Sequence, residues 1–191
     1  MNAQGEIDGP LRTIDDVIDL YLRVGAAHYG EDVSQTEHAL QCAALARRAK
    51  VANELVAAAL LHDIGHLVHL EAHGGAVDVN VVDDTHEAVG ARVLARLFPP
   101  SVTAPVAMHV EAKRYRCATD PAYFARLSAA SKRSLELQGG PLDRHQIATF
   151  AQHPAANDAL LLRSWDDEGK ITGLELGTID DYRSVLQLVA R

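Results

Sequence analysis

Residues 53–67 read NELVAAALLHDIGHL, and this run decides the fold because its first part is apolar on every side of a helix. Such a helix is stable when it is buried at the centre of a domain. The run continues with His62 and Asp63 side by side, and His66 follows one turn later. An ionised carboxylate in this setting costs free energy unless a cation or strong donors compensate it. The run therefore predicts the core of the protein and a polar site at the edge of that core.

The rest of the chain predicts more helices and no hairpin of strands. Thr13 with Asp16, and Ser34 with Glu37, have the spacing of capping boxes that start helices. The expected helices are 14–27, 34–50, 54–67, 85–98 (capped by Asp84 or Thr85), 103–115, 121–139, 143–152, 154–166 and a last one from Thr178 to about residue 190. Residues 69–83 are expected to form a long loop. We therefore expect a single all-α domain over residues 1–191, with its helical core at about 13–166.

Composition and charge exclude several classes of function. The chain carries 26 acidic side chains against 18 Lys and Arg, a net charge of −8, which disfavours binding to nucleic acid or anionic lipid. The first 20 residues lack the apolar core of a signal peptide, and the apolar run Leu55–Leu61 is too short to span a bilayer. Cys42 and Cys117 form no C-x-x-C pair. We expect a cytoplasmic protein without nucleic-acid or membrane partners, and the oligomeric state stays open.

Histidine is over-represented, with ten residues against five Tyr, three Phe and one Trp. Six His and Asp side chains come from five separate expected helices, and imidazoles with carboxylates suit iron, manganese or zinc. They exceed what one tetrahedral zinc needs, and an aspartate with two oxygens can bridge two ions. A hydrogen-bonded pair at a helix end is the alternative for His62 and Asp63 alone. We predict a dinuclear metal site with the ligands His38, His62, Asp63, His86, His109 and Asp166.

The pattern of His38, His62-Asp63 and Asp166 resembles the H…HD…D signature of the HD-domain superfamily, whose members are mostly phosphohydrolases. The additional His86 and His109 resemble its dinuclear branch. Longer stretches are similar to the HD-type family associated with phosphonate degradation, and they are residues 29–31, 37–41, 60–66, 83–87, 109–115, 134–141 and 162–167. The HD dipeptide is common, whereas Lys-Arg-Tyr at 113–115 and Gln-Gly-Gly-Pro at 138–141 are more specific.

The resemblance implies a helical HD-type bundle that holds a mixed-valent pair of irons and uses O2. It assigns His38, His62, Asp63 and Asp166 to one iron, with Asp63 bridging to a second iron held by His86 and His109. It assigns the phosphonate or hydroxyl end of the substrate to His66, Lys113, Ser131, Gln138 and Arg163. Glu31 matches a carboxylate that meets the amino group, and Tyr29 matches a tyrosine that covers the open iron position. On this resemblance the expected catalytic residues are Tyr29, Glu31 and His66.

Spacing gives independent support to the anion-binding residues. Lys113 follows His109 by four residues and Arg163 precedes Asp166 by three, so each cation shares a helix face with a candidate ligand. Two cations beside a metal could hold a compact dianion through charge-assisted bonds. The ordinary alternative for Lys113 is a solvated surface residue. For Arg163 it is a surface ion pair with Asp167.

The implied reaction is oxidative cleavage of the carbon–phosphorus bond of a small 1-hydroxyalkylphosphonate. The expected example is 2-amino-1-hydroxyethylphosphonate, giving glycine and phosphate. Glu31 favours a cationic end on the substrate, and the few aromatic residues favour a primary amine over a trimethylammonium group. Two other functions remain open, namely a metal-dependent phosphohydrolase acting on a nucleotide or small phosphate ester, and a non-catalytic metal or ligand sensor.

Overall fold

The computed structural model describes residues 11–28, 32–74 and 85–191, and the structural statements below concern these residues. They form helices, joined by turns and by an isolated antiparallel bridge between His28 and Ser34. The helices are α1 (Ile14–Val24), α2 (Gln35–Arg48), α3 (Asn53–Leu61), α4 (Ile64–Ala72), α5 (His86–Leu94), α6 (Pro100–Thr119), α7 (Pro121–Arg126), α8 (Ala129–Leu137), α9 (Arg144–Gln152), α10 (Ala156–Glu168), the 3-10 helix η1 (Ile179–Tyr182) and α11 (Arg183–Val189). The predicted all-α class is confirmed.

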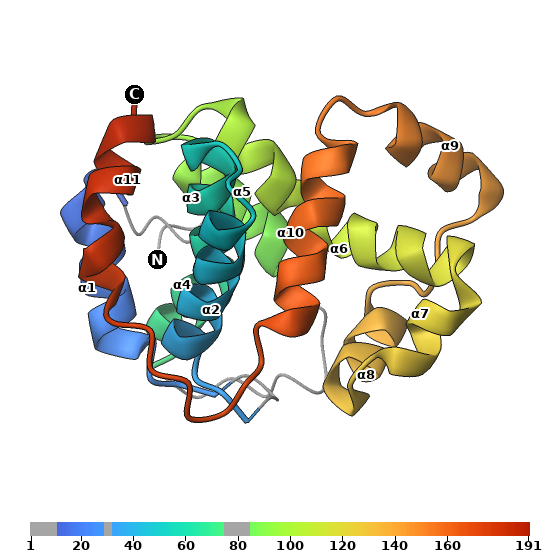
Figure 1. Cartoon of the computed structure of the whole chain (residues 1–191), viewed down its shortest axis with the longest axis horizontal. Coiled ribbons are helices and arrows are strands. Elements are labelled where there is room, and N and C mark those ends of the chain that lie inside the picture. Colours follow the sequence, from blue (N-terminus) through green and yellow to red (C-terminus); the bar gives the residue numbers. More distant parts are fainter. Residues whose placement is uncertain (1–10, 29–31, 75–84) are drawn as a thin grey trace.

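The apolar helix α3 lies at the centre, in contact with α2, α6, α10 and α11 (Figure 1). Residues Leu55 to Leu61 are all buried, as the sequence predicts. The main core joins residues of α1 to α6 with residues of α10, η1 and α11. Smaller apolar clusters connect α6, α9 and α10, and α7 with α8, on the other side of the molecule.

Residues 53–72 are long and apolar enough to cross a membrane if length and composition alone are considered. Their mean hydropathy is 1.2, and 78% of this window is buried inside the fold. A core helix of a globular domain meets the same two criteria, and burial against the neighbouring helices accounts for the apolar surface here.

The expected helix 54–67 is wrong in its continuity, because α3 ends at Leu61 and the backbone leaves the helical conformation at Asp63, while His62 keeps helical dihedral angles. Asp63 has φ −97° and ψ 11°, and α4 begins immediately after it. In an uninterrupted helix adjacent side chains diverge by about 100°, so this break lets both residues face one site. The Leu60 carbonyl lies in the last turn of α3, where carbonyls lack helical partners. It accepts a 2.8 Å hydrogen bond from the buried Tyr21 hydroxyl.

Other boundaries also differ from the expectation. Helix α4 continues to Ala72, so the expected loop 69–83 is helical at its start, while residues 75–83 lie outside the described residues. Helix α6 starts at Pro100 because proline suits the first helical position. The expected helix 121–139 is two helices, because the Ser128 hydroxyl accepts from the Ser131 amide and caps a new start. The predicted capping boxes of Thr13 and Ser34 are confirmed.

Gly65 allows α4 and α5 to cross at very short distance. A Cβ atom at Gly65 would lie 2.0 Å from the His86 carbonyl oxygen, whereas one at Gly90 would lie 3.3 Å from the Gly65 amide nitrogen. The chain therefore needs glycine at position 65 for its backbone to touch the first residue of α5. This contact fixes His86 relative to Asp63.

We expect Gly65→Ala to destabilise the fold by roughly 1–3 kcal/mol, because the added methyl group must push the two backbones apart. Gly90→Ala is the matched control, since the crowding there is milder and alanine raises helix propensity by about 1 kcal/mol. Chemical denaturation of both variants measures the difference. Equal stability of Gly65→Ala and the parent protein would contradict the proposed close crossing.

Candidate metal centre

The six predicted ligands converge on one site, to which five parts of the fold contribute. His38 comes from α2, His62 and Asp63 from the break between α3 and α4, His86 from the start of α5, His109 from α6 and Asp166 from α10. Residues separated by up to 128 positions in the chain thus meet in the core. The side chains of the four histidines are between 0% and 7% exposed.

One oxygen of Asp63 faces a first group of side chains. Its Oδ2 lies 3.6 Å from His38 Nε2 and 3.4 Å from His62 Nε2. Asp166 completes this group, with Oδ1 at 3.3 Å from His38 Nε2 and Oδ2 at 3.9 Å from His62 Nε2. The two imidazole Nε2 atoms are 3.3 Å apart.

The other oxygen of Asp63 faces a second group. Its Oδ1 lies 3.4 Å from His86 Nε2 and 3.5 Å from His109 Nε2. These two nitrogens approach each other to 3.0 Å. The carboxylate of Asp63 therefore stands between two groups of donors and offers one oxygen to each.

Backbone carbonyls set the orientation of three of the imidazoles. The Nδ1 atoms of His38, His62 and His109 lie 2.8, 3.0 and 2.7 Å from the carbonyl oxygens of Gly169, Ala59 and Val106. A carbonyl oxygen can only accept, so each Nδ1 carries the proton. In the neutral tautomer Nε2 then points a lone pair into the site. Such outer hydrogen bonds are typical of histidines that bind metals.

The donor atoms are spaced as metal ligands require. Metal–ligand bonds of about 2.0–2.2 Å place neighbouring donors roughly 3.0–3.5 Å apart, which matches most separations within both groups. In the neutral forms of His38 and His62 both Nδ1 protons face carbonyls, so without a cation or a further proton their Nε2 lone pairs would face each other across 3.3 Å. The geometry therefore fits a metal ion in each group, with Asp63 between the two ions.

The electrostatics of the site favour bound cations. Burial raises the pKa of Asp63 and Asp166, but nearby imidazoles and the Arg163 guanidinium outweigh burial and hold both pKa values well below the usual range. Burial lowers the pKa of His62 to about 4, so this imidazole is neutral. For His38, burial lowers the pKa, but Cys42 and Asp166 outweigh it and raise the value. Ionised carboxylates in the core need positive charge, which a proton or a metal could supply.

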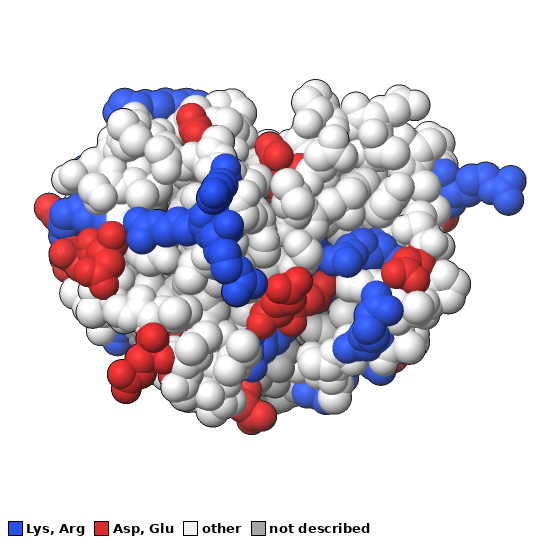
Figure 2. Space-filling view, viewed as in Figure 1, with Lys and Arg blue, Asp and Glu red and all other residues white. Residues whose placement is uncertain are grey.

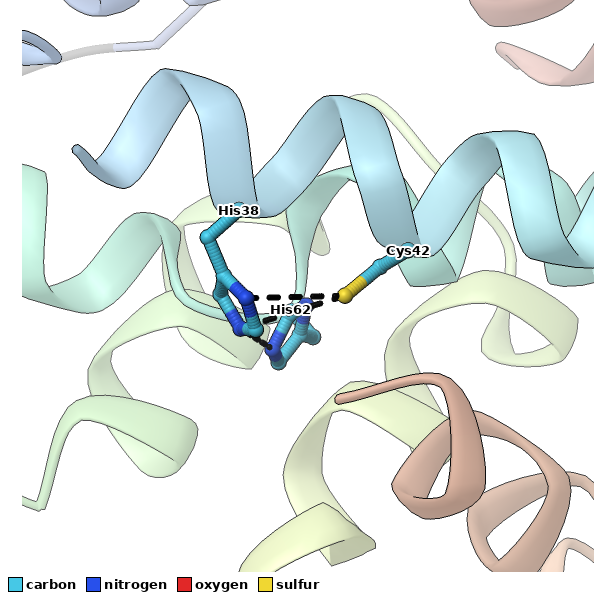
Figure 3. A group of neighbouring side chains, drawn as sticks. All are labelled: His38, Cys42 and His62. Carbon is cyan, nitrogen blue, oxygen red and sulfur yellow. Dashed lines mark hydrogen bonds between the residues drawn. The ribbon is translucent and has the colours of Figure 1, made fainter. Parts of the chain in front are cut away.

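Cys42 lies beside the first group, and the sequence analysis did not identify it. Its Sγ is 3.8 Å from both ring nitrogens of His38 (Figure 3), and the thiol donates to the Trp165 carbonyl at 3.4 Å. His38, Cys42 and His62 lie close enough to hold a metal together. Burial raises the pKa of Cys42, which keeps the thiol protonated at neutral pH. We therefore treat it as a packing neighbour of His38.

His66 lies against the second group. Its ring stacks on the ring of His86 with centroids 3.9 Å apart and an interplanar angle of 22°.

Burial separates the ten histidines into two sets. Five are buried and converge on this site, namely His38, His62, His66, His86 and His109. The other five are exposed or half-buried, and these are His28, His69, His73, His145 and His153. Half of the ten histidines therefore belong to the site, and the other half lie at or near the surface.

The two predicted anion-binding cations are buried, which argues against the surface alternatives. Lys113 is 3% exposed and donates a 2.8 Å hydrogen bond to the Ser134 hydroxyl. Arg163 is also 3% exposed, and its Nη1 lies 2.6 Å from Asp166 Oδ2. The same guanidinium pairs with Asp167. The alternative of an ion pair with Asp167 is thus present, but it is buried and it includes a candidate metal ligand.

The remaining predicted contacts are placed unevenly. Ser131 is buried in the first turn of α8. Gln138 lies just beyond the C-terminal end of that helix, and its buried Oε1 has no hydrogen-bond partner. Tyr29 and Glu31 lie outside the described residues, so their predicted contacts remain predictions. Tyr123 and Asp167 connect to the site through Arg163. The Tyr123 hydroxyl accepts from Arg163 Nε at 3.1 Å and donates to Asp167 at 2.7 Å.

Thr85 has a strained backbone directly before His86. Its φ of +48° is in the left-handed region, which is unusual for a β-branched residue. Thr85 occupies the N-cap position of α5, one of the two predicted candidates, but its side chain makes no capping hydrogen bond. The other candidate, Asp84, lies outside the described residues. Strain of this kind clusters at functional sites, and here it accompanies the turn that brings His86 into the site.

Comparisons with known proteins place the chain in a family. Residues 36–147 match the family model of the HD domain. The chain is 42% identical over 178 residues to a hydroxymethylphosphonate dioxygenase of Gimesia maris, covering 93% of this chain and 88% of that protein. It is also 42% identical over 174 residues to the glycine-betaine-forming [1-hydroxy-2-(trimethylamino)ethyl]phosphonate dioxygenase of Leisingera caerulea, covering 90% of this chain and 86% of that protein.

Asp63→Ala should abolish metal binding in the second group and weaken it in the first, because both groups lose a ligand. His109→Ala should leave metal in the first group alone. Elemental analysis of purified protein measures both losses, and His153→Ala is the control because that histidine is exposed on the surface. Full metal content in Asp63→Ala would contradict a bridging carboxylate.

Proposed function

Since the chain belongs to the HD-domain family and within it to the phosphonate dioxygenases, we propose that it cleaves the carbon–phosphorus bond of a small 1-hydroxyalkylphosphonate with dioxygen. The observation that carries this proposal is the Asp63 carboxylate, with one oxygen facing each of two histidine groups. A donor set for two metals, in a chain similar to two dioxygenases over most of its length, supports a redox enzyme that uses a dinuclear metal cofactor.

We propose that the two metals are irons in a mixed-valent pair. His38, His62, Asp63 and Asp166 would hold one iron, and Asp63, His86 and His109 the other. A bound iron pair supplies the electrons for activating dioxygen and positions for binding substrate oxygens. Oxidation suits the substrate because a carbon leaving group makes direct hydrolysis of a carbon–phosphorus bond unfavourable. The first product would be a carboxylic acid and the second inorganic phosphate.

Lys113 and Arg163 would have different roles at the phosphonate end. The hydrogen bond of Lys113 is to a neutral hydroxyl, so its positive charge is not neutralised by that partner. Arg163 pairs with Asp166 and Asp167, so it orients a candidate ligand and compensates its charge before it contacts any substrate. His66, Ser131 and Gln138 would add polar contacts, and the unpartnered Oε1 of Gln138 could accept from the substrate hydroxyl.

We propose 2-amino-1-hydroxyethylphosphonate as the preferred substrate, with Glu31 binding its ammonium group and glycine as a product. A trimethylammonium group is usually enclosed by open aromatic faces. Tyr115 instead packs on Phe150 with centroids 4.8 Å apart, Trp165 belongs to the main core, and Arg116 covers the ring of Tyr123. These aromatic side chains are already engaged, which favours a primary amine. Tyr29, which would cover the open iron position, is the remaining aromatic candidate.

Phosphate release should depend on dioxygen and on iron. We expect the iron-loaded protein to release phosphate from 2-amino-1-hydroxyethylphosphonate in air and not under anaerobic conditions. Hydroxymethylphosphonate and the trimethylammonium compound are the comparison substrates, and Glu31→Gln should reduce the preference for the amine. Electron paramagnetic resonance tests for a mixed-valent pair. Release of phosphate from esters without dioxygen, supported by manganese or magnesium, would instead establish the phosphohydrolase alternative.

Lys113→Ala should raise KM for the phosphonate about ten- to a hundredfold, because a buried charge-assisted bond is lost. Burial lowers the pKa of Lys113 to about 8, so the ammonium form that binds the dianion is lost as the pH rises through this value. KM of the parent protein should therefore increase above about pH 8, and that increase should be absent in Lys113→Ala.

Lys132→Ala is the control for this variant, because Lys132 contacts the Ala125 carbonyl and Phe124 rather than the candidate site. Iron content is measured in both variants. An unchanged KM in iron-loaded Lys113→Ala would remove this lysine from the phosphonate site.

A further inference from the structure

A cavity of about 400 Å³ lies beside the candidate metal centre, between the C-terminal end of α10 and the helices α6 to α8. This volume is within the usual range for binding a small organic molecule. The hydroxyl-bearing residues Ser128, Ser131 and Ser164 line it. Of these, Ser131 is also a predicted contact of the phosphonate group. The cavity therefore adjoins the anion end of the proposed substrate site.

Charged side chains of both signs line the cavity, with one more basic than acidic side chain among the described residues. Arg116, Arg126 and Lys170 line it together with Asp167 and Glu168. Arg116 pairs with Asp167 and Arg126 with Asp120, and the Lys170 ammonium lies near Asp166. Asp167 is already compensated, because Arg163 and Arg116 pair with it and Tyr123 donates to it. Glu168 is exposed to solvent. Figure 2 shows this side of the molecule from outside, with acidic side chains at the foot of α10 and both basic and acidic side chains over the neighbouring helices.

Lys170 lies between the cavity and the metal centre. It lines the cavity, and its Nζ is 3.9 Å from Oδ1 of Asp166. Its positive charge helps to lower the pKa of both Asp166 and Lys113. The side chain is 21% exposed, so it remains accessible to solutes in the cavity. Sequence spacing gave no signal for this residue, because it lies in the turn after α10.

The backbone on both sides of Lys170 is fixed by α2. The Gly169 carbonyl accepts from His38 Nδ1 at 2.8 Å. Gln41 makes two bonds to Ile171, donating from Nε2 to its carbonyl at 2.8 Å and accepting at Oε1 from its amide at 2.9 Å. A Cβ atom at Gly169 would lie 2.8 Å from Cys42 Sγ, so this turn is pressed against α2. The position of Lys170 is thus tied to a candidate metal ligand.

We propose that this cavity is a binding site for phosphonate and phosphate anions next to the metal centre, and that Lys170 is a binding residue that contacts the anion where the cavity approaches Asp166. This proposal rests on the proposed function, which supplies the phosphonate substrate. It adds the cavity through which the anion would reach the metal centre, and Lys170 as a third cation beside Lys113 and Arg163. The phosphonate group of the substrate and the free phosphate product are both small anions with charged oxygens, so either could bind in the cavity. KM tests binding of the substrate, and the dissociation constant for phosphate tests binding of the product.

The test compares Lys170→Gln, which removes the charge, with Lys170→Arg, which keeps it. We expect Lys170→Gln to raise KM and the dissociation constant for inorganic phosphate about five- to tenfold, with kcat and iron content within a factor of about two. Lys170→Arg should restore most of the affinity. Calorimetric titration of the iron-loaded protein measures phosphate binding independently of turnover. Lys132→Gln is the control for loss of a lysine outside the cavity.

Arg126→Gln tests the outer part of the cavity, because this arginine side chain is 64% exposed. Its charge should attract the anion at long range, so we expect kcat/KM to fall about two- to threefold at low ionic strength and not at high ionic strength. Equal effects at both ionic strengths, or none, would remove Arg126 from the proposed route.

Two results would overturn the role of Lys170. One is an unchanged KM and phosphate affinity in iron-loaded Lys170→Gln. The other is loss of iron in both Lys170 variants, which would make the lysine a support of Asp166 alone. If the parent protein oxidises none of the three hydroxyphosphonates, the proposed function fails, and phosphate titration of the iron-loaded protein still decides whether Lys170 binds the anion.

Discussion

The carboxylate of Asp63 is the constraint on which the rest of the structure depends. It is held in the core with four imidazole nitrogens within 3.6 Å of its oxygens. An ionised carboxylate is costly to bury without positive charge. A proton on His38, whose pKa Cys42 and Asp166 raise against the effect of burial, supplies part of this charge in the absence of metal. Two metal ions would supply it fully and would also bind the facing Nε2 lone pairs of His38 and His62, which are 3.3 Å apart. Metal ions bridged by Asp63 would thus compensate the charge of the carboxylate and accept the lone pairs of the imidazole nitrogens.

Several features of the fold serve this arrangement. The helix breaks at His62 and Asp63, and the buried Tyr21 hydroxyl bonds to a carbonyl next to the break. The close crossing at Gly65 brings the start of α5 to the same place. The turn after α10 returns to α2 and holds His38 through its Nδ1. Each feature is explained by the position that it gives to a donor atom.

Much of this could be predicted from sequence, because hydrophobic periodicity and capping boxes are local signals. The buried α3 and the capping boxes at Thr13 and Ser34 follow from spacing and residue type. The meeting of six His and Asp side chains is not a local signal, and it was predicted from their residue types together with the resemblance to the HD pattern. The break at Asp63, the Ser128 cap and the strained Thr85 do not, because tertiary contacts override helical propensity there. Lys170 and Cys42 were missed because contact across the fold, rather than spacing, places them at the site.

The most direct test of the account is anomalous diffraction at the iron absorption edge, from crystals of protein purified with iron. The account predicts two anomalous peaks on opposite sides of the Asp63 carboxylate. One should lie among His38, His62 and Asp166, and the other between His86 and His109. A single peak, or two peaks that do not share Asp63, would contradict the bridging carboxylate.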